Sequence, residues 1–398
     1  MRLRNVLEFP VKGKKILLRV DINSPVYMGK PLDNPRFEMH GKTVRELAKK
    51  GAKIIIIAHQ GRKGSKDFIA SLEKHARLIE KHAKVRVKYV DFLFEKKAGD
   101  MISCMKNGEA ILLRNVRDYD DEYDAKNRKN RYFSFSKMFD MYANDAFSVC
   151  HRSQGSVILP PREIMGYAGP ALWNEMKSLG KFKVKGRKKM LFIIGGEKIE
   201  DYLPLMKMLK NRNARMIACG VLGDLIIYSK GIKMGYEERW LKEKGYLKNL
   251  PKIREILGRY GKRVICPVDA AVGKHRRKEI MLDDLPVNEK IKDIGKESIK
   301  IFGDEIGKAE AVFMKGPLGV SEEQGFSYGT VKILGKIAKL TKEKKIYSLI
   351  GGGHLTETID RYRVKRGFSY MSLSGGALIK WITGEKLPGI EALKNSKN

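Results

Sequence analysis

Short runs of apolar residues alternate along the chain with longer segments whose apolar residues recur every three or four positions. In the first half, runs at 54–58 and 111–113 and a run ending at Asn144 predict strands, and 41–50 and 71–82 predict helices. Strands that are apolar throughout are buried on both faces, as in parallel sheets joined by crossover helices. A second series of this kind runs from Met190 to about Ile382. The pattern therefore predicts α/β architecture in both halves.

One helical segment separates the two series. Residues 168–179 carry apolar positions at helical spacing, and a basic stretch bracketed by glycines follows at 180–189. We interpret the two together as a connection between domains. The predicted division is an N-terminal domain at 1–167, the connection at 168–189, a C-terminal domain at 190–382 and a tail at 383–398. A polar segment at 126–131 predicts a surface loop.

In the first half, the apolar runs end in polar and charged residues. Ligands of open α/β sheets bind at the carboxyl ends of the strands. There, arginine forks match carboxylate and phosphate oxygens, and a histidine adds a donor. The candidates for holding an anionic substrate are Asp21, Asn23, Arg36, His59, Arg62, Arg117 and Arg152. Each residue alone is commonplace beside a strand, and the prediction depends on finding them together.

In the second half, the apolar runs end in glycines. Gly-rich turns occur at 195–198, 351–354 and 374–377, each between an apolar run and a helical pattern. Glycine lets the backbone approach a phosphate, and a helix N-terminus supplies N–H groups. A single Gly-Gly is usually only a turn, and the spacing of a Walker P-loop is absent. The two halves together predict an enzyme that holds a small acid against a nucleotide.

Composition adds one unusual feature, a formal charge of +35 from 81 Lys and Arg against 46 Asp and Glu. A solvated basic surface explains it most simply; contact with nucleic acid and adaptation to heat or salt remain alternatives. Four scattered cysteines without a CxxC pair favour a reducing, cytoplasmic location. No apolar run is long enough to cross a membrane, and the first residues carry no apolar signal segment.

The order of motifs resembles the phosphoglycerate kinase family, especially its archaeal branch, over nearly the whole chain. The matching segments are Leu18–Pro25 (RVDxNxP), His59–Arg62 (HxGR), Arg114–Arg117 (ENxR), Asn144–Phe147 with His151–Ser153 (NDAF and HR), Gly195–Lys198 (GGAK), Gly316–Val320 with Glu322 (NGPxGxFE), Gly351–His354 (the archaeal GGGH) and Leu387–Gly389. So many motifs in family order make a chance similarity implausible.

The resemblance implies two Rossmann-like, parallel-sheet lobes joined by a helical hinge, with the tail returning to the first lobe. It implies reversible phosphoryl transfer between 1,3-bisphosphoglycerate and ADP, giving 3-phosphoglycerate and ATP, in glycolysis and gluconeogenesis. The seven candidates above would hold the phosphoglycerate, and Mg²⁺ would arrive with ADP or ATP. The residues that would hold the nucleotide are Gly195, Gly196, Lys198, Gly220, Gly316, Pro317, Glu322, Gly351, Gly352, Gly353 and His354.

Transfer between anions needs alignment and charge neutralisation more than acid–base chemistry. We expect Arg36 and Lys198, one from each lobe, to neutralise the transferring group, helped by N–H groups at Gly375 and Gly376. Closure of the lobes would exclude water. Glu322 would hold the ribose.

The departures from the family pattern lie mostly on the nucleotide side. Relative to the family, Glu197 replaces Ala, Tyr202 replaces a Lys that many members carry, Lys315 replaces Asn, Ser321 replaces Phe, Cys219 replaces Gly, and His354 replaces an Asp beside the metal. The turn at 372–377 reads SLSGGA instead of STGGGA. These changes keep two alternatives open: a catalytically weakened paralogue that binds phosphoglycerate or RNA, and a kinase for another phospho-acid. We favour a monomer whose nucleic-acid binding, if any, is non-specific.

Overall fold

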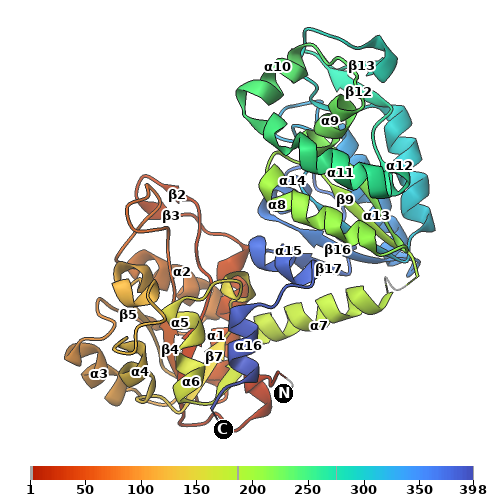
Figure 1. Ribbon diagram of the computed structural model, residues 1–398. Helices are drawn as coiled ribbons and strands as arrows, with labels where there is room; N and C mark the ends of the chain where they lie inside the picture. Colours follow the sequence, from red (N-terminus) through yellow and green to blue (C-terminus); the bar gives the residue numbers. More distant parts are fainter. Residues whose placement is uncertain (1–2, 186–187, 275, 398) are drawn as a thin grey trace. The chain divides into compact units, whose positions relative to one another are not determined.

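The computed structural model describes residues 3–185, 188–274 and 276–397 (Figure 1). Its chain divides into two compact units. Unit 1 comprises Met1–Lys177 with Gly384–Asn398, and unit 2 comprises Ser178–Thr383. Across the described parts of the chain, no helix is both long and apolar enough to cross a membrane.

Unit 1 contains a six-stranded parallel sheet in the order β5-β6-β4-β1-β7-β8. Its strands are β1 (Lys15–Arg19), β4 (Lys53–Ile57), β5 (Val87–Val90), β6 (Ala110–Leu113), β7 (Met141–Asn144) and β8 (Gly166–Ala168), and a small hairpin adds β2 (Val26–Tyr27) and β3 (Lys30–Pro31). Its α-helices are α1 (Pro35–Lys49), α2 (Glu73–Ala83), α3 (Lys96–Ser103), α4 (Tyr132–Ser136), α5 (Gly155–Ile158), α6 (Pro160–Glu163) and α16 (Pro388–Lys394). Short 3-10 helices lie at Val6–Glu8, Val116–Asp118, Asp120–Glu122 and Phe147–Val149.

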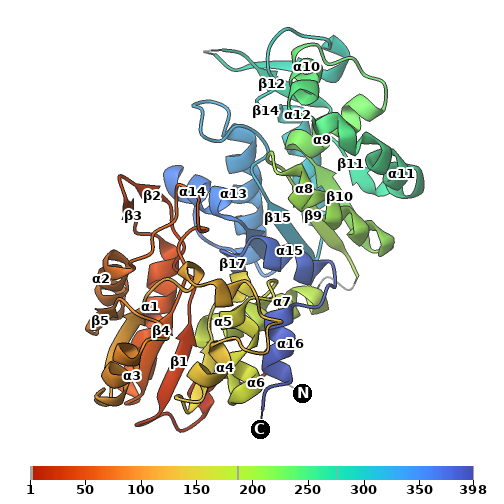
Figure 2. The same ribbon diagram turned by 60° about the vertical axis from the view of Figure 1, so that its left-hand side comes forward.

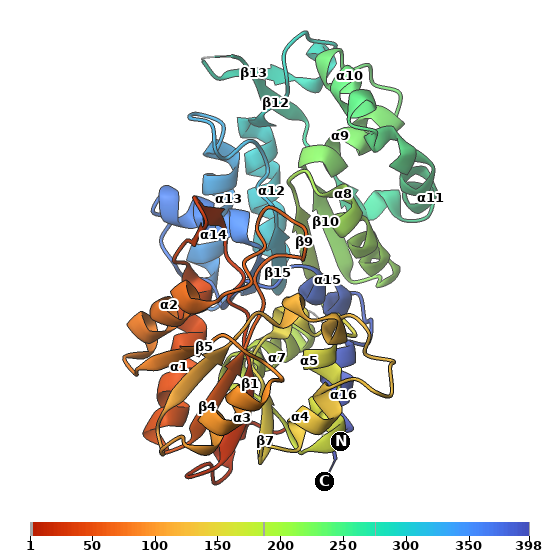
Figure 3. The ribbon, with the colours of Figure 1, turned by 90° about the vertical axis from the view of Figure 1, so that its left-hand side faces the viewer.

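The central strands of this sheet are apolar because both of their faces are covered. Strand β1 lies between β4 and β7 (Figure 3). Ile16 of β1 stands opposite Ile54 of β4 and Met141 of β7. This face packs against α1 and α2, and Leu17 and Ile55 on the opposite face are equally buried. The strands predicted at 54–58 and 111–113 and before Asn144 are therefore confirmed to within a residue or two.

The predicted helix boundaries were less accurate. Helix α1 begins at Pro35, six residues before the predicted start, because Asn34 caps it by accepting from the N–H of Arg36 at 3.0 Å. Helix α2 begins at Glu73 rather than Ser71 and ends where Lys84 turns into the left-handed region at φ 56°. The segment at 126–131 contains turns and no helix or strand, and α4 begins directly after it.

Helix α7 (Pro170–Lys185) carries the division between the units, which falls between Lys177 and Ser178. The prediction of a helix at 168–179 was wrong at both ends, because Ala168 ends β8 and the basic residues continue the helix to Lys185. Gly186 and Arg187 of the predicted connection lie outside the described residues. The domain limits at 167, 189 and 382 stay predictions.

Unit 2 contains a second six-stranded parallel sheet, in the order β11-β10-β9-β15-β16-β17. Its strands are β9 (Met190–Ile194), β10 (Ala214–Ala218), β11 (Val264–Ile265), β15 (Ala311–Lys315), β16 (Tyr347–Gly351) and β17 (Tyr370–Ser372). Its α-helices are α8 (Ile199–Tyr202), α9 (Gly220–Ser229), α10 (Tyr236–Glu243), α11 (Leu250–Tyr260), α12 (Lys296–Lys308), α13 (Tyr328–Lys342), α14 (Gly353–Arg361) and α15 (Gly376–Ile382). Short 3-10 helices lie at Leu203–Lys210, Tyr246–Asn249, Gly261–Arg263 and Leu282–Asp284.

A small antiparallel sheet, absent from the sequence prediction, completes unit 2. It joins β13 (Lys278–Met281), β12 (Asp269–Val272) and β14 (Asp293–Ile294). In the main sheet, one face packs against α12, α13 and α14. On the other face, Phe192 and Phe313 pack with Phe182 of α7, with ring centroids 5.9–6.4 Å apart. The α/β architecture predicted for the second half is confirmed by this sheet.

The end of the chain belongs to unit 1. Helix α16 lies beside α5 and α6 (Figure 2) and also contacts β8. Gly389 donates its N–H to the carbonyl of Cys150 at 2.8 Å, and Lys397 donates to that of Pro161 at 2.9 Å. A Cβ on Gly389 would lie 2.9 Å from the Cα of Cys150, so only glycine permits this approach.

Candidate functional site

A group of cationic side chains lies at and near the carboxyl ends of the strands of unit 1. We call it the cationic cluster and define it as Arg19, Arg36, His59, Arg62, Arg117 and Arg152. Four of its arginines act electrostatically on His59, and Arg62 acts on Arg152. The structure therefore brings together the predicted basic residues, and it adds Arg19.

His59 is a neutral hydrogen-bond donor within this cluster. Its side chain is buried, and its Nδ1 lies 3.1 Å from Nη2 of Arg19. Because a guanidinium only donates, Nδ1 accepts, and the ring proton is on Nε2. Burial lowers the pKa of His59 well below its usual value, and the neighbouring arginines lower it further. A neutral imidazole can donate to an anionic ligand without adding to the local positive charge.

Arg117 is buried with part of its hydrogen-bonding capacity unused. It donates from Nη1 to the carbonyl of Gly61 at 2.6 Å. Its Nε is buried and has no hydrogen-bond partner within the described parts of the chain. Burial and repulsion by Arg19 and Arg152 lower the pKa of Arg117 to about 10. Such a group is stabilised by an anion that neutralises it.

Arg36 and Asp21 form an ion pair that connects helix α1 to the loop after β1. Asp21 also accepts from the hydroxyl of Ser148 and from the N–H of Asn23, at 3.1 Å in the latter case. Asn23 in turn accepts from the N–H of Gly61 at 2.8 Å. Burial lowers the pKa of Arg36 to about 10. The two polar residues predicted to fix a substrate hydroxyl therefore also connect the loops after β1 and β4.

Arg62 and Arg152 are the more accessible members of the cluster. The side chain of Arg62 is exposed, and that of Arg152 is half-buried. Burial lowers the pKa of Arg152, and the charges of Arg62 and Arg19 lower it further. These two residues lie where an incoming anion could first meet the cluster.

Arg19 is a functional candidate that the sequence reasoning did not select, although it lies in a quoted motif. It is fully buried and donates from Nε to the hydroxyl of Ser156 at 2.9 Å. Ser156 donates in turn to the buried carboxylate of Glu122, from Oγ at 2.9 Å and from its N–H at 2.8 Å. Burial raises the pKa of Glu122, and Arg19 opposes that rise. The sequence did contain a signal for this role, because Arg19 is a charged residue within an otherwise apolar run.

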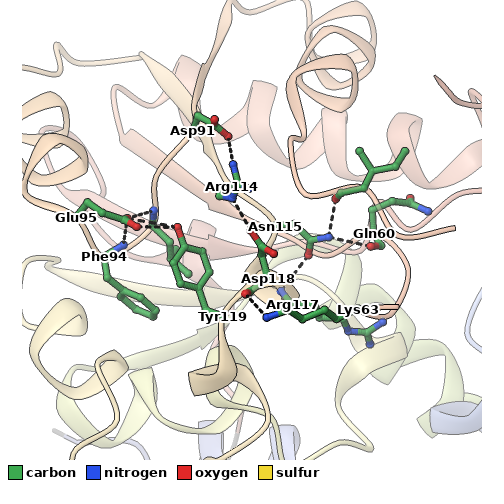
Figure 4. A network of polar contacts seen from close by, with 12 residues as sticks. Gln60, Lys63, Asp91, Phe94, Glu95, Arg114, Asn115, Arg117, Asp118 and Tyr119 are labelled. Atoms are coloured by element: carbon green, nitrogen blue, oxygen red, sulfur yellow. Dashed lines mark hydrogen bonds and ion pairs between the residues drawn. The ribbon is translucent and has the colours of Figure 1, made fainter. Parts of the chain in front are cut away.

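Gln60 and Asn115 hold the loops of the cluster in place and were also missed as candidates (Figure 4). Asn115 donates from its amide to the carbonyls of Gln60 and Ile69, both at 2.8 Å. Its side-chain oxygen accepts from the N–H of Arg117 at 3.0 Å. Gln60 exchanges hydrogen bonds with the backbone of Ser24, at 2.9 and 3.0 Å. These amides act as positioning residues for the basic side chains.

A second buried support lies behind Asp21. His40 accepts from the N–H of Asp21 at Nε2, so its Nδ1–H donates to Asp145 at 2.7 Å. Asp145 also accepts from Thr43 and from the N–H of Ala171, both at 2.7 Å. The carboxylate therefore connects β7, α1 and the start of α7, which explains the need for Asp at this position of its motif.

In unit 2, four of the glycines predicted to bind phosphates lie close to one another. A Cβ on Gly195 would lie 2.1 Å from the carbonyl oxygen of Pro317, and one on Gly316 would lie 2.0 Å from that of Gly195. A Cβ on Gly220 would lie 2.7 Å from the backbone nitrogen of Gly196. The loops after β9, β10 and β15 pack so closely here that a side chain would overlap with a neighbouring backbone, which explains the glycines. Their contact with a nucleotide stays a prediction.

Other predicted glycines lie beside open space. A Cβ on Gly353 or Gly375 would have no atom within 4 Å, and one on Gly352 would meet only Nζ of Lys315, at 3.6 Å. Gly353 is the first residue of α14, and Gly376 is the first residue of α15. Their backbone can therefore approach a ligand, as the prediction requires. Gly351 differs, because its Cβ would lie 2.8 Å from the side chain of Leu378.

The predicted side chains of unit 2 are mostly exposed. They are Lys198, Glu322 and His354. Lys198 caps α8, and its charge acts on Lys315, which is buried. Glu197, a departure from the family motif, accepts from the hydroxyl of Tyr246 at 3.0 Å.

The described part of the chain offers no group of side chains suited to hold a metal ion. Among the residues that the structure describes, no group of three or more His, Cys, Asp or Glu side chains could hold one. His354 presents an imidazole near the start of α14, and Mg²⁺ prefers oxygen ligands.

Comparisons with known proteins agree with this picture. A family model described as "Phosphoglycerate kinase" matches residues 6–385. The phosphoglycerate kinase of Methanothermus fervidus is 36% identical over 401 residues, which cover 98% of this chain and 96% of that protein. The phosphoglycerate kinase of Sulfurisphaera tokodaii is 36% identical over 400 residues, with coverages of 98% and 95%.

Solved structures give the same result. The crystal structure of phosphoglycerate kinase from Pyrococcus horikoshii superposes with a TM-score of 0.89 at 30% identity, covering 98% of each chain. That of Coxiella burnetii, at 23% identity, shows the shared fold with a TM-score of 0.83. The resemblance and the fold class predicted from the motifs are confirmed. The chain belongs to the phosphoglycerate kinase family and is a phosphotransferase of glycolysis.

Proposed function

We propose that unit 1 binds 3-phosphoglycerate or 1,3-bisphosphoglycerate through the cationic cluster, and that unit 2 binds ADP or ATP through the glycines at the starts of α14 and α15. The cationic cluster carries this proposal. Five arginines gather there, and the acidic groups that act on them include Asp21, Glu122 and Glu175. A surplus of buried positive charge is stabilised by a ligand that carries both a carboxylate and a phosphate.

The expected roles follow from hydrogen-bonding capacity. The free Nε of Arg117 and the Nε2–H of His59 are donors available to ligand oxygens. Arg62 and Arg152 supply accessible charge, and Asn23 and Asp21 would accept from a hydroxyl. All seven residues keep the substrate-binding role expected for them, and Arg19 joins them as the donor that fixes the ring of His59.

In the direction that forms ATP, an oxygen of the β-phosphate of ADP attacks the phosphorus of the acyl phosphate. The bond between that phosphorus and the carboxyl oxygen breaks, and 3-phosphoglycerate leaves as a carboxylate. No proton needs to move, so the protein contributes position and positive charge. Arg36 and Lys198 would neutralise the oxygens of the transferring group, with the N–H groups at Gly375 and Gly376.

Mg²⁺ would enter as part of the nucleotide substrate, bound by phosphate oxygens. The exposed imidazole of His354 would lie near the phosphates without ligating the metal. The four cysteines are free, which fits the cytoplasm that we propose as the location, and we propose a monomer as the working form.

A coupled assay of the purified protein, run in both directions, tests the function. Arg117→Met should raise the KM for 3-phosphoglycerate on the order of 10–100-fold, the value of a charge-assisted hydrogen bond. The matched control is Arg77→Met on the exposed surface of α2, which should behave like the parent. A pure, folded parent without turnover would refute the proposed activity.

A further inference from the structure

Lys315 is a buried lysine whose ammonium group has no close partner among the residues that the structure describes. It ends β15, between Ile194 of β9 and Gly351 of β16, and is only 6% exposed. Its backbone carbonyl accepts from the N–H of Gly195 at 2.9 Å. Its Nζ makes no hydrogen bond or ion pair with any residue in the described ranges. Burying an ammonium ion in this way is unfavourable unless another group compensates it.

The charges that act on Lys315 only partly compensate for its burial. Asp201 of α8 favours its charged form, and Lys198 at the cap of the same helix disfavours it. Burial is the largest effect, and the pKa of Lys315 is lowered to about 8. Buried lysines with a lowered pKa occur often at ligand-binding and catalytic sites.

The position of the ammonium group indicates which ligand that is. Nζ lies 3.6 Å from the place where a Cβ of Gly352 would stand, and Gly352 has φ +106°. Gly353 follows with open space beside it and begins α14, a helix of nine residues. The ammonium group and the N–H groups of the helix start therefore lie around the same open region. Both kinds of donor favour an anion there.

We propose that Lys315 is a phosphate-binding residue of the nucleotide site, donating from Nζ to a phosphoryl oxygen of ADP or ATP. The inference rests on the proposed function and deepens it. The residue replaces the Asn of the family motif, so this chain uses a titratable cation at a position where the motif has a neutral amide. Nucleotide affinity in this protein should therefore depend on the protonation of one buried lysine.

Calorimetric titration with ADP tests the proposal on three proteins: the parent, Lys315→Met and Lys315→Arg. Lys315→Met should weaken ADP binding on the order of 10–100-fold, because a charge-assisted hydrogen bond is lost. Its melting temperature should be equal to or above that of the parent, because methionine removes an unpaired buried charge. Lys315→Arg keeps the charge and should recover part of the affinity. The control is Lys336→Met on the exposed surface of α13, which should leave both quantities unchanged.

The pH dependence gives a second measurement that a purely structural lysine would not affect. In the protein without nucleotide, Lys315 is charged below its pKa of about 8. The affinity for ADP should therefore fall as the pH rises above that value. For this pKa and a 10–100-fold loss of affinity with the charge, the Kd of the parent should rise by about fourfold and up to eightfold between pH 7.5 and 9. Other ionisable groups of this part of unit 2 include Asp201 and Tyr202 of α8, Lys198 at its cap and His354 of α14, and Lys315→Met retains all of them. That variant should therefore lack this change in Kd.

Three results would overturn the proposal. One is a Lys315→Met variant that binds ADP like the parent, and another is a variant that shows the same pH dependence. The third is a variant whose affinity and melting temperature fall together without rescue by arginine, since that result indicates a structural role. If the parent is active and Lys315→Met binds ADP with unchanged affinity, only the role of Lys315 is refuted. If the parent has no turnover but binds ADP, and Lys315→Met loses that binding, only the proposed function is refuted. If the parent does not bind ADP, both are refuted.

Discussion

Replacement of Arg36 by methionine separates the structural task of this side chain from the catalytic task that we propose for it. Its guanidinium pairs with Asp21, and its side chain is 24% exposed. Methionine keeps a flexible stem of similar shape but removes the charge. The variant therefore leaves Asp21 without its cation, although Asp21 still accepts from Ser148 and Asn23. Stability and turnover should both fall, for different reasons.

The two effects differ in size. Breaking a fully buried ion pair costs about 3–5 kcal/mol, and partial exposure of Arg36 reduces this to about 1–2 kcal/mol. That loss lowers the melting temperature by roughly 2–8 °C for a unit of this size. Removing a cation that acts mainly in the transition state typically costs a factor on the order of 10²–10³ in kcat. Turnover should therefore fall far more than the fraction of folded protein.

The coupled assay, run with melting curves, distinguishes these losses. Asp21→Asn in the same protein removes the unpaired carboxylate, so the double variant should recover most of the stability lost by Arg36→Met. It should not recover kcat, since the guanidinium is still missing. If Arg36→Met turns over like an active parent, Arg36 does not act in the transition state. If Asp21→Asn restores kcat, the loss was caused by the unpaired carboxylate.

Four further predictions concern other parts of the protein. Lys198→Ala should lower turnover while leaving the calorimetric affinity for 3-phosphoglycerate nearly unchanged, because Lys198 belongs to unit 2; a collapse of that affinity would contradict the assignment. Gly316→Ala should lose more than about 3 kcal/mol in denaturant unfolding, because its Cβ would lie 2.0 Å from the carbonyl oxygen of Gly195 at φ +78°. His354→Asp should keep activity or lower the Mg²⁺ concentration needed for half-maximal rate, and a nucleotide complex with an imidazole–Mg²⁺ bond would argue against this. Filter binding of unrelated RNAs should lose all of them together as salt rises, and retention of one RNA at ~0.2 M salt would indicate a specific partner.

The sequence predicted structure best where a pattern of residues is compatible with only one kind of structure. Apolar runs such as Ile54–Ala58 predicted strands because few other structures bury every side chain of a short run. Helix starts were less accurate, although Asn34 and Pro35 carried the signal for α1. Most basic residues of the cationic cluster could be selected from the sequence because they follow strands, as Arg62 does; their contact with a substrate stays a prediction.

The remaining features depend on three-dimensional contacts that spacing does not encode. Arg19 resembles the end of a strand in the sequence, and only its contacts with His59 and Ser156 show its role. A glycine that faces open space, such as Gly353, cannot be distinguished in the sequence from one like Gly316 that faces another backbone. The burial of Lys315, and its lack of a close partner among the described residues, likewise follow from packing that the sequence does not show.

The return of the chain end to unit 1 has a consequence for the order in which the protein folds during synthesis. Leu387, Ile390 and Leu393 are nearly fully buried, and each is worth about 1.5–3 kcal/mol. Together they contribute roughly 5–9 kcal/mol, which is comparable to the whole stability of a typical domain. The ribosome makes these residues after all of unit 2, whose residues are contiguous. Unit 2 can therefore fold before they are made, whereas unit 1, although most of it is made first, becomes fully stable only after they have followed.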